Sequence, residues 1–296
     1  MNKYRTGFLY AFLGITIFSF TLPMVKLSLP SFAPWTLTFG RAAIAGTIAL
    51  VLLIIKKVPI PDKKLWSKIF VTSLGIVVGF PVLTTFALQQ TTSAHGAVII
   101  AGLPMATAVI AVIRLSEREP IGFWIAALIG TATLVGYALS NGGNENSSLI
   151  ADLMLFGAVL AAAIGYAEGA LLTKVMPGWQ VVSWCVLILL PITIPVFIVT
   201  LINGWSDHQI TAVGVGAFLF TAIGSMYLGF FAWYRGLSEL GVTKGSQVQM
   251  LQALLTLAWS ALLLGESVTV KTLLAASVVI ACVAITQKIR AKAATA

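Results

Sequence analysis

Charged residues are scarce in this chain. Asp, Glu, Lys and Arg make up 9% of its 296 residues, whereas 59% are hydrophobic. An average soluble domain has about 25% charged residues, so too few charges are present here to cover a water-exposed surface. Cysteine is also rare. Cys185 and Cys282 both fall within apolar segments, which argues against a disulfide framework or a thiolate metal site. We therefore expect a membrane protein with no metal or other cofactor.

Several functional motifs are missing as well. The sequence contains no HExxH, no GxSxG and no pair of carboxylates within an apolar segment, which leaves an intramembrane enzyme as a distant alternative. It also lacks GxxxxGK[ST], so this chain by itself is not expected to use ATP. The net charge of +9 comes without a basic helix carrying interleaved aromatics, so nucleic acid is not an expected partner. A receptor or assembly scaffold is an equally distant alternative, because such proteins usually have long loops or a soluble domain and the loops here are short.

What the sequence has in abundance is long apolar segments. A helix needs about 20 residues to cross the hydrocarbon core of a bilayer. The segments are continuous and do not alternate with polar residues, which favours helices over barrel strands. We predict an all-α integral membrane protein with ten transmembrane helices, at residues 7–27, 34–55, 66–88, 96–114, 121–140, 151–173, 180–203, 211–234, 245–264 and 269–287.

The basic residues indicate the orientation of these helices. With ten spans, both termini and alternate loops share one side of the membrane. That side receives Lys3, Arg5, Lys56, Lys57, Lys63, Lys64, Lys68, Arg114, Arg118, Lys174, Arg235, Lys244, Lys288, Arg290 and Lys292. The other side receives only Lys26 and Lys271. Because positive residues accumulate in cytoplasmic loops, we expect both termini in the cytoplasm.

The two halves of the chain resemble each other. A shift of 149 positions places Glu117 on Glu266, Gly96 on Gly245, His95 on Lys244 and Leu88 on Leu237. We therefore predict one compact membrane domain made of two five-helix repeats, at residues 1–143 and 148–290. Because five is an odd number of spans, the second repeat must be inverted. Inverted repeats are common in secondary transporters, whose substrate site lies near mid-membrane between the repeats.

Several segments resemble the EamA family of the drug/metabolite transporter superfamily, and within it the YddG-type bacterial exporters of aromatic amino acids. The resemblance covers essentially the whole chain. It is carried by Gln247–Ser267 (QVQMLQALLTLAWSALLLGES), its first-half counterpart His95–Glu119, Gly79–Gln89 (GFPVLTTFALQ), Gly165–Leu172 (GYAEGALL), Gly178–Trp184 (GWQVVSW) and Leu228–Leu237 (LGFFAWYRGL).

This resemblance implies a central cavity lined mainly by helices 1, 3, 4, 6, 8 and 9. It also implies export of amino acids or similar small metabolites from the cytoplasm by alternating access. Export or facilitated uptake of another solute class, such as amines, organic cations, nucleosides or drugs, stays an alternative, because one scaffold serves many substrates. The resemblance implies a location in a bacterial inner membrane, and the expected partners are the lipid bilayer and a small-molecule substrate. The oligomeric state stays open, with a monomer as one alternative.

Charged residues within spans are costly and so are candidates for function. Glu168 lies seventeen residues into helix 6 and could bind a substrate ammonium or couple transport to protons. It could also be a structural acceptor, or a partner of Lys174 or Arg235. Arg41 lies seven residues into helix 2 and could pair with a substrate carboxylate. A packing or topology role is favoured for it, because helix 2 is outside the cavity-lining group. Lys26 is expected to extend toward the headgroups.

Polar and aromatic residues of the later helices form a second group of candidates. Gln249 and Gln252 are three positions apart on helix 9, so they share a face that must find partners away from lipid. Tyr227, Phe230 and Tyr234 follow helical spacing on helix 8. They could form a wall that stacks on substrate, or they could contact lipid or neighbouring helices. The remaining candidates for substrate binding are Phe18, Ser19, Phe80, Thr84, His95 and Tyr166.

His95 opens helix 4 and could titrate near neutral pH, or it could simply satisfy the helix start. Pro81 and Pro104 each remove a backbone donor within helices 3 and 4. They could act as hinges for gating or as static kinks.

Overall fold

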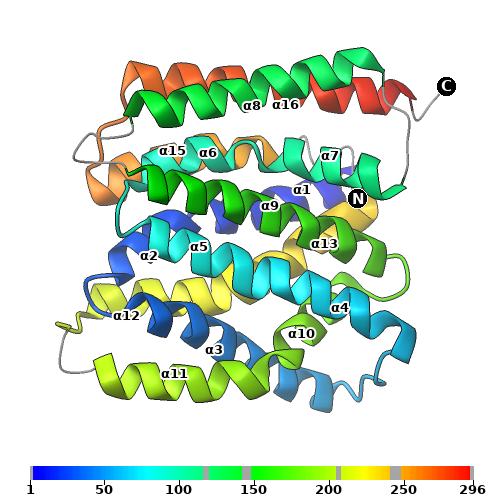
Figure 1. The fold of residues 1–296 in the computed structure, drawn as a ribbon. Helices are drawn as coiled ribbons and strands as arrows, with labels where there is room; N and C mark the ends of the chain where they lie inside the picture. Colours follow the sequence, from blue (N-terminus) through cyan, green and yellow to red (C-terminus); the bar gives the residue numbers. More distant parts are fainter. Residues whose placement is uncertain (1–2, 116–119, 142–147, 205–207, 241–247, 294–296) are drawn as a thin grey trace.

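The computed structural model describes residues 3–115, 120–141, 148–204, 208–240 and 248–293, and the regular structure within them is helical. The helices run side by side along one long direction of the bundle (Figure 1). The elements are α1 (Lys3–Ser19), α2 (Thr21–Ser28), α3 (Pro34–Ile55), η1 (Lys63–Leu65), α4 (Trp66–Ser73), η2 (Leu74–Gly79), α5 (Phe80–Ala87), α6 (Ser93–Ile100), α7 (Leu103–Leu115), α8 (Ile121–Asn141), α9 (Leu149–Leu172), α10 (Gly178–Ile188), α11 (Leu190–Gly204), α12 (Ala212–Leu219), η3 (Phe220–Leu228), α13 (Gly229–Leu240), α15 (Leu251–Leu264) and α16 (Val270–Ala293).

The prediction of an all-helical membrane protein is confirmed. Seven helical stretches of the described residues are long and apolar enough to cross a bilayer, and α10 with α11 forms a further span bent by 58°. The shorter apolar helices α15 and Val270–Thr286 lie in the last two predicted spans. Many large apolar side chains are exposed on the outside of the bundle, where a bilayer supplies their apolar surroundings.

Helix pairing follows the two halves of the chain. Helix α1 packs on α13, and α5 packs on α9. A shift of 149 positions turns the first of these pairs into the second, because it relates span 1 to span 6 and span 3 to span 8. Three further pairs join a span to its own counterpart: α3 with α11, α6 with α15, and α8 with α16 at the edge of the bundle (Figure 1). The packing therefore has the approximate two-fold pattern that two repeats would generate.

Irregular backbone also recurs at equivalent positions. The two π-helical segments are η2, which ends at Gly79, and η3, which ends at Leu228, and these residues are 149 apart. Helix α6 ends at its C-cap Ala101, and α15 begins after its N-cap Met250, again 149 apart. Interrupted helices expose backbone groups that a continuous helix would satisfy, and π segments gather at functional sites. Predicted helix 4 is therefore two helices, broken near the middle of the bundle.

Two glycines allow α1 and α13 to approach closely. A Cβ on Gly14 would lie 2.8 Å from the Trp233 nitrogen, and one on Gly236 would lie 2.5 Å from the Ala11 nitrogen. Small residues at helix interfaces permit such backbone contact in membranes, where van der Waals packing drives helix association. This contact joins the first helix of one repeat to the third helix of the other.

Candidate functional site

Two narrow cavities lie side by side in the middle of the bundle and share the side chains of Phe18, Thr21, Phe80 and Gln252. The first, which we call the helix-break cavity, is also lined by Ile100, Ala101, Pro104, Gln249 and Met250, among others. It thus lies between the break after α6 and the break before α15. The second, which we call the arginine cavity, is also lined by Arg41, Ile76, Tyr166, Ser225 and Phe230, among others. Each has room for about one or two water molecules.

Both cavities draw their walls from both halves of the chain. Phe18 stands edge-on to Phe230, with ring centroids 4.9 Å apart, and Tyr166 stands edge-on to the same ring at 6.0 Å. The hydroxyls of Thr21 and Ser225 hydrogen-bond each other at 2.6 Å. The site combines an aromatic wall with a few polar groups, which is the usual make-up of a small-molecule pocket.

Eight of the residues singled out from the sequence line these cavities: Phe18, Arg41, Phe80, Pro104, Tyr166, Phe230, Gln249 and Gln252. Their contact with a substrate stays a prediction. Gln249 is 4% exposed, and its Nε2 has no hydrogen-bond partner among the described residues. A buried amide with a free donor is costly unless something else binds it.

The other candidates from the sequence lie elsewhere. Trp259 donates a hydrogen bond from Nε1 to Ser19 Oγ at 2.9 Å, and Thr84 donates to the Phe80 carbonyl at 2.7 Å. The Tyr227 hydroxyl hydrogen-bonds Ser183 at 2.7 Å. Three more of the candidates are buried but line neither cavity: Pro81, Glu168 and Tyr234.

Arg41 is the functional candidate that sequence reasoning placed wrongly. It lies on α3, is 3% exposed and lines the arginine cavity, although helix 2 was expected to stay outside the cavity-lining group. Its Nε and Nη1 atoms have no hydrogen-bond partner among the described residues. The signal in the sequence was the position of a positive charge well inside an apolar segment. What the sequence could not supply was the direction in which that side chain points.

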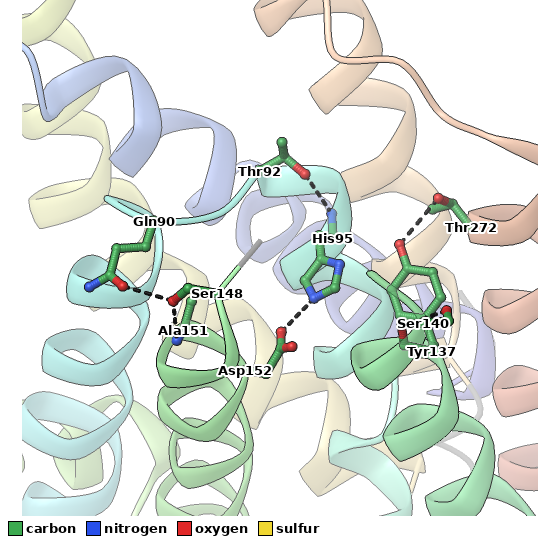
Figure 2. Close-up of polar contacts among 9 residues, drawn as sticks. All are labelled: Gln90, Thr92, His95, Tyr137, Ser140, Ser148, Ala151, Asp152 and Thr272. Atoms are coloured by element: carbon green, nitrogen blue, oxygen red, sulfur yellow. Dashed lines mark hydrogen bonds and ion pairs between the residues drawn. The ribbon is translucent and has the colours of Figure 1, made fainter. Parts of the chain in front are cut away.

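A polar cluster lies at the end of the bundle away from the two termini. His95 Nε2 is 2.5 Å from Asp152 Oδ1, so α6 and α9 are joined by a buried pair (Figure 2). The His95 ring also stacks on Tyr137, whose hydroxyl is 3.2 Å from the Thr272 hydroxyl. Sequence reasoning missed Asp152. The available signal was that His95 and Asp152 each occupy the first turn of a helix that starts at the same end.

Lys26 and Glu266 extend this cluster. Lys26 Nζ donates to the carbonyls of Leu88 and Thr91 at 2.6 and 2.8 Å, rather than reaching toward headgroups as predicted. The Glu266 carboxylate accepts from the backbone nitrogens of Ser93 and Ala94 at 2.9 and 2.7 Å. A carboxylate at a helix N-terminus satisfies otherwise unpaired amides. Together the two side chains fix the connection between α5 and α6. We call these residues, with His95 and Asp152, the end cluster.

Among the described residues, no group of three or more His, Cys, Asp or Glu side chains is placed to hold a metal ion. The two cysteines are buried and free. The polar residues of the cavities are an arginine, amides, hydroxyls and a tyrosine, so the site is suited to binding a solute by hydrogen bonds, charge and stacking.

A membrane bundle of two related halves, with cavities where the halves meet, defines the class as a membrane transporter. Comparison with known proteins agrees. The model of the EamA-like transporter family matches twice, over residues 5–139 and 149–287. The chain belongs to this family.

Two bacterial proteins described as uncharacterized transporters are similar to the chain. The chain is 39% identical over 287 residues to "Uncharacterized transporter YdeK" of Bacillus subtilis (strain 168), an alignment that covers 96% of this chain and 98% of the relative. It is 26% identical over 145 residues to "Uncharacterized transporter" of Haemophilus influenzae, covering 48% of this chain and 83% of that one. A solved crystal structure with 16% sequence identity has a TM-score of 0.64, covering 95% of this chain and 97% of its own, which shows a shared fold.

Proposed function

We propose that this EamA-family protein is a secondary transporter that exports amino acids or similar small metabolites from the cytoplasm by alternating access. The observation that carries the proposal is the location of the cavities. They lie between the two halves of the chain, next to helix breaks that recur at equivalent positions. Inverted-repeat transporters bind substrate at such an interface, where discontinuous helices present backbone groups to the solute.

The narrowness of the cavities supports a cycle with a closed intermediate. Room for about one or two waters is too little for an amino acid. The helices around the cavities must therefore separate before a substrate enters. The paired arrangement of α1 with α13 and of α5 with α9 supplies two related halves that can rock against each other.

The chemistry of the helix-break cavity supports amino acids as the substrate class. Pro104 has no N–H, so the carbonyl of Ile100 lacks its usual helical donor, and both residues line this cavity. The negative end of the α6 dipole lies at the same place. A freed carbonyl and a helix C-terminus suit an ammonium group. Amines, organic cations, nucleosides and drugs are the competing solute classes.

Export requires the end cluster to close the outer face. We place this end outside the cytoplasm because fifteen basic residues lie on the side of the termini and two on the other. Lys26 and Glu266 tie the α5–α6 connection to residues from both halves, so their hydrogen bonds must break for release. A C-terminal fusion to a reporter that is active only in the cytoplasm tests this orientation. An inactive reporter would place the C-terminus outside the cytoplasm and so contradict the proposed orientation.

Glu168 is the group we propose for proton coupling. It is a buried carboxylate on α9, two residues from Tyr166 in the arginine cavity, so its protonation could be linked to opening of that cavity. Uptake of labelled amino acids into proteoliposomes, with and without a pH gradient, gives the test. If Glu168→Gln leaves a gradient-dependent transport rate unchanged, the coupling role is abandoned. Facilitated diffusion would show no gradient dependence in the wild type.

The same proteoliposomes test the proposal as a whole. Vesicles preloaded with one unlabelled amino acid should accumulate the labelled form by exchange, and empty vesicles lacking the protein should not. Screening twenty amino acids alongside a quaternary amine and a nucleoside identifies the solute class. Exchange of the amine or nucleoside without exchange of any amino acid would replace the proposed class with one of its competitors.

A further inference from the structure

Arg41 is a buried cation whose charge the described protein does not balance. Its side chain is 3% exposed at mid-bundle, and Nε and Nη1 have no hydrogen-bond partner there. Among the described residues it forms no ion pair. An unpaired charge away from water is strongly unfavourable, and charges within membrane spans cost several kcal/mol even on lenient scales. A residue that only packed α3 against its neighbours would not need to carry that cost.

The surroundings of Arg41 are built to receive a ligand. Arg41 is one of the residues that line the arginine cavity, so its side chain lies beside the space between the two halves. No Asp or Glu is among the residues described as lining either cavity. A guanidinium with free N–H groups has a geometry that matches a carboxylate, which it can bind through two parallel hydrogen bonds.

We propose that Arg41 binds the carboxylate of the transported solute, so that the substrate is a monocarboxylate with an apolar body. This deepens the proposed function, on which it rests, because it names the group that the site requires. The apolar body would lie on the aromatic wall formed by Phe18, Phe80 and Phe230. Thr21, Ser225 and Gln252 offer the remaining polar contacts.

The proposal separates solute classes by charge. One cation lines the arginine cavity, and no acidic side chain among the described residues lines either cavity, so the only side-chain charge described at the site is positive. A monocarboxylate neutralises the site when it binds. A simple amine or organic cation would add a second positive charge near Arg41, which is unfavourable in a low-dielectric interior. The amine, organic-cation and drug alternatives are therefore disfavoured by the same residue.

The first experiment uses the wild-type protein and three solutes with one aromatic body. L-phenylalanine carries both a carboxylate and an ammonium, 3-phenylpropanoate carries only the carboxylate, and phenethylamine carries only the ammonium. Inhibition of labelled amino acid exchange in proteoliposomes ranks their binding. We expect both carboxylates to compete and phenethylamine to compete at least tenfold more weakly, since charge-assisted hydrogen bonds are the strong ones. Equal competition by phenethylamine would overturn the proposal.

The second experiment uses variants of Arg41 with a matched control. Arg41→Gln and Arg41→Met should bind the carboxylates about 10- to 100-fold more weakly, and Arg41→Lys should keep part of the affinity because it keeps a point charge. Arg235→Gln removes one positive charge from a side chain that is 63% exposed and lines neither cavity, and it should leave exchange unchanged. Unchanged competition by 3-phenylpropanoate in Arg41→Gln would refute the role of Arg41.

Thermal unfolding distinguishes this role from a structural one. Because the charge is unpaired in the empty protein, Arg41→Met should unfold at the same or a higher temperature than the wild type without solute. Carboxylate should raise the unfolding temperature of the wild type and not of Arg41→Met. A clear loss of stability in Arg41→Met without solute would show that Arg41 supports the fold instead. Absence of exchange of any amino acid by the wild type, with 3-phenylpropanoate still stabilising it, would reject the proposed function and leave the carboxylate site standing.

Discussion

The end cluster and the two central cavities differ in whether their charged and amide side chains meet a partner. In the end cluster, Lys26 and Glu266 each make two hydrogen bonds, and Asp152 lies against His95. In the cavities, nitrogens of Arg41 and Gln249 have no hydrogen-bond partner among the described residues. Satisfied buried groups hold elements in place, whereas unsatisfied ones leave binding capacity unused. We therefore assign closure and stability to the end cluster, and solute binding to the cavities.

The stabilising role of the end cluster is tested most directly at the buried His95–Asp152 pair (Figure 2). Asp152→Ala removes the acceptor that faces His95 Nε2 and should lower the free energy of unfolding by about 3–5 kcal/mol, because one partner of a buried pair is lost. Unfolding by SDS in mixed micelles measures the change. Asp152→Asn keeps an acceptor and should cost less. A loss below about 1 kcal/mol for Asp152→Ala would show that the pair does not hold α6 against α9.

A smaller loss is expected at Glu266. Glu266→Ala leaves the backbone nitrogens of Ser93 and Ala94 without their acceptor, which should cost about 1.5–3 kcal/mol for hydrogen bonds to a charged group. Because the α5–α6 connection is also loosened, labelling of a single cysteine introduced at Gln90 should become faster. An exposed contact offers a control: Ser238→Ala removes the hydrogen bond from the Ser238 hydroxyl to the Arg235 carbonyl and should cost no more than about 1 kcal/mol. Equal losses in the two variants would remove the distinction between buried and exposed polar contacts here.

The smallest change in the free energy of unfolding is expected from a substitution in the helix-break cavity, which should nevertheless reduce exchange. Gln249→Leu removes a buried amide whose Nε2 has no hydrogen-bond partner among the described residues. The free energy of unfolding should therefore fall by less than about 1 kcal/mol, or it should rise. Exchange of amino acids should nevertheless fall, because a polar contact of the cavity is gone. A large destabilisation would mean that Gln249 stabilises the fold, as the residues of the end cluster do.

The fold was accessible from sequence because membrane helices obey strong local rules. A span must be about 20 apolar residues long and must satisfy its own backbone hydrogen bonds, so composition and length locate it. The same rules could not foresee the interruptions. The break at Ala101 and the π segments η2 and η3 depend on how one helix packs on another, and no charged residue marks these places in the sequence.

The candidate site was accessible only in part. Aromatic and amide residues such as Phe230 and Gln252 were found because their spacing and the family resemblance indicated an inward face. Asp152 escaped notice because a carboxylate at the first turn of a helix is ordinary at a membrane boundary. Arg41 was noticed and then assigned to the wrong surroundings, since one sequence gives the depth of a residue in the membrane and not the direction of its side chain.

By itself the sequence determined that this protein is helical, lies in a membrane and has related halves, because hydrophobicity and charge act over short distances along the chain. The tertiary structure decided which polar residues meet. It brought Lys26 to the carbonyls of Leu88 and Thr91, and Glu266 to the start of α6, across long separations in sequence. It also left Arg41 facing a cavity without a carboxylate. The physical reason is that partnership between buried polar groups depends on distance in space, which only the packed bundle defines.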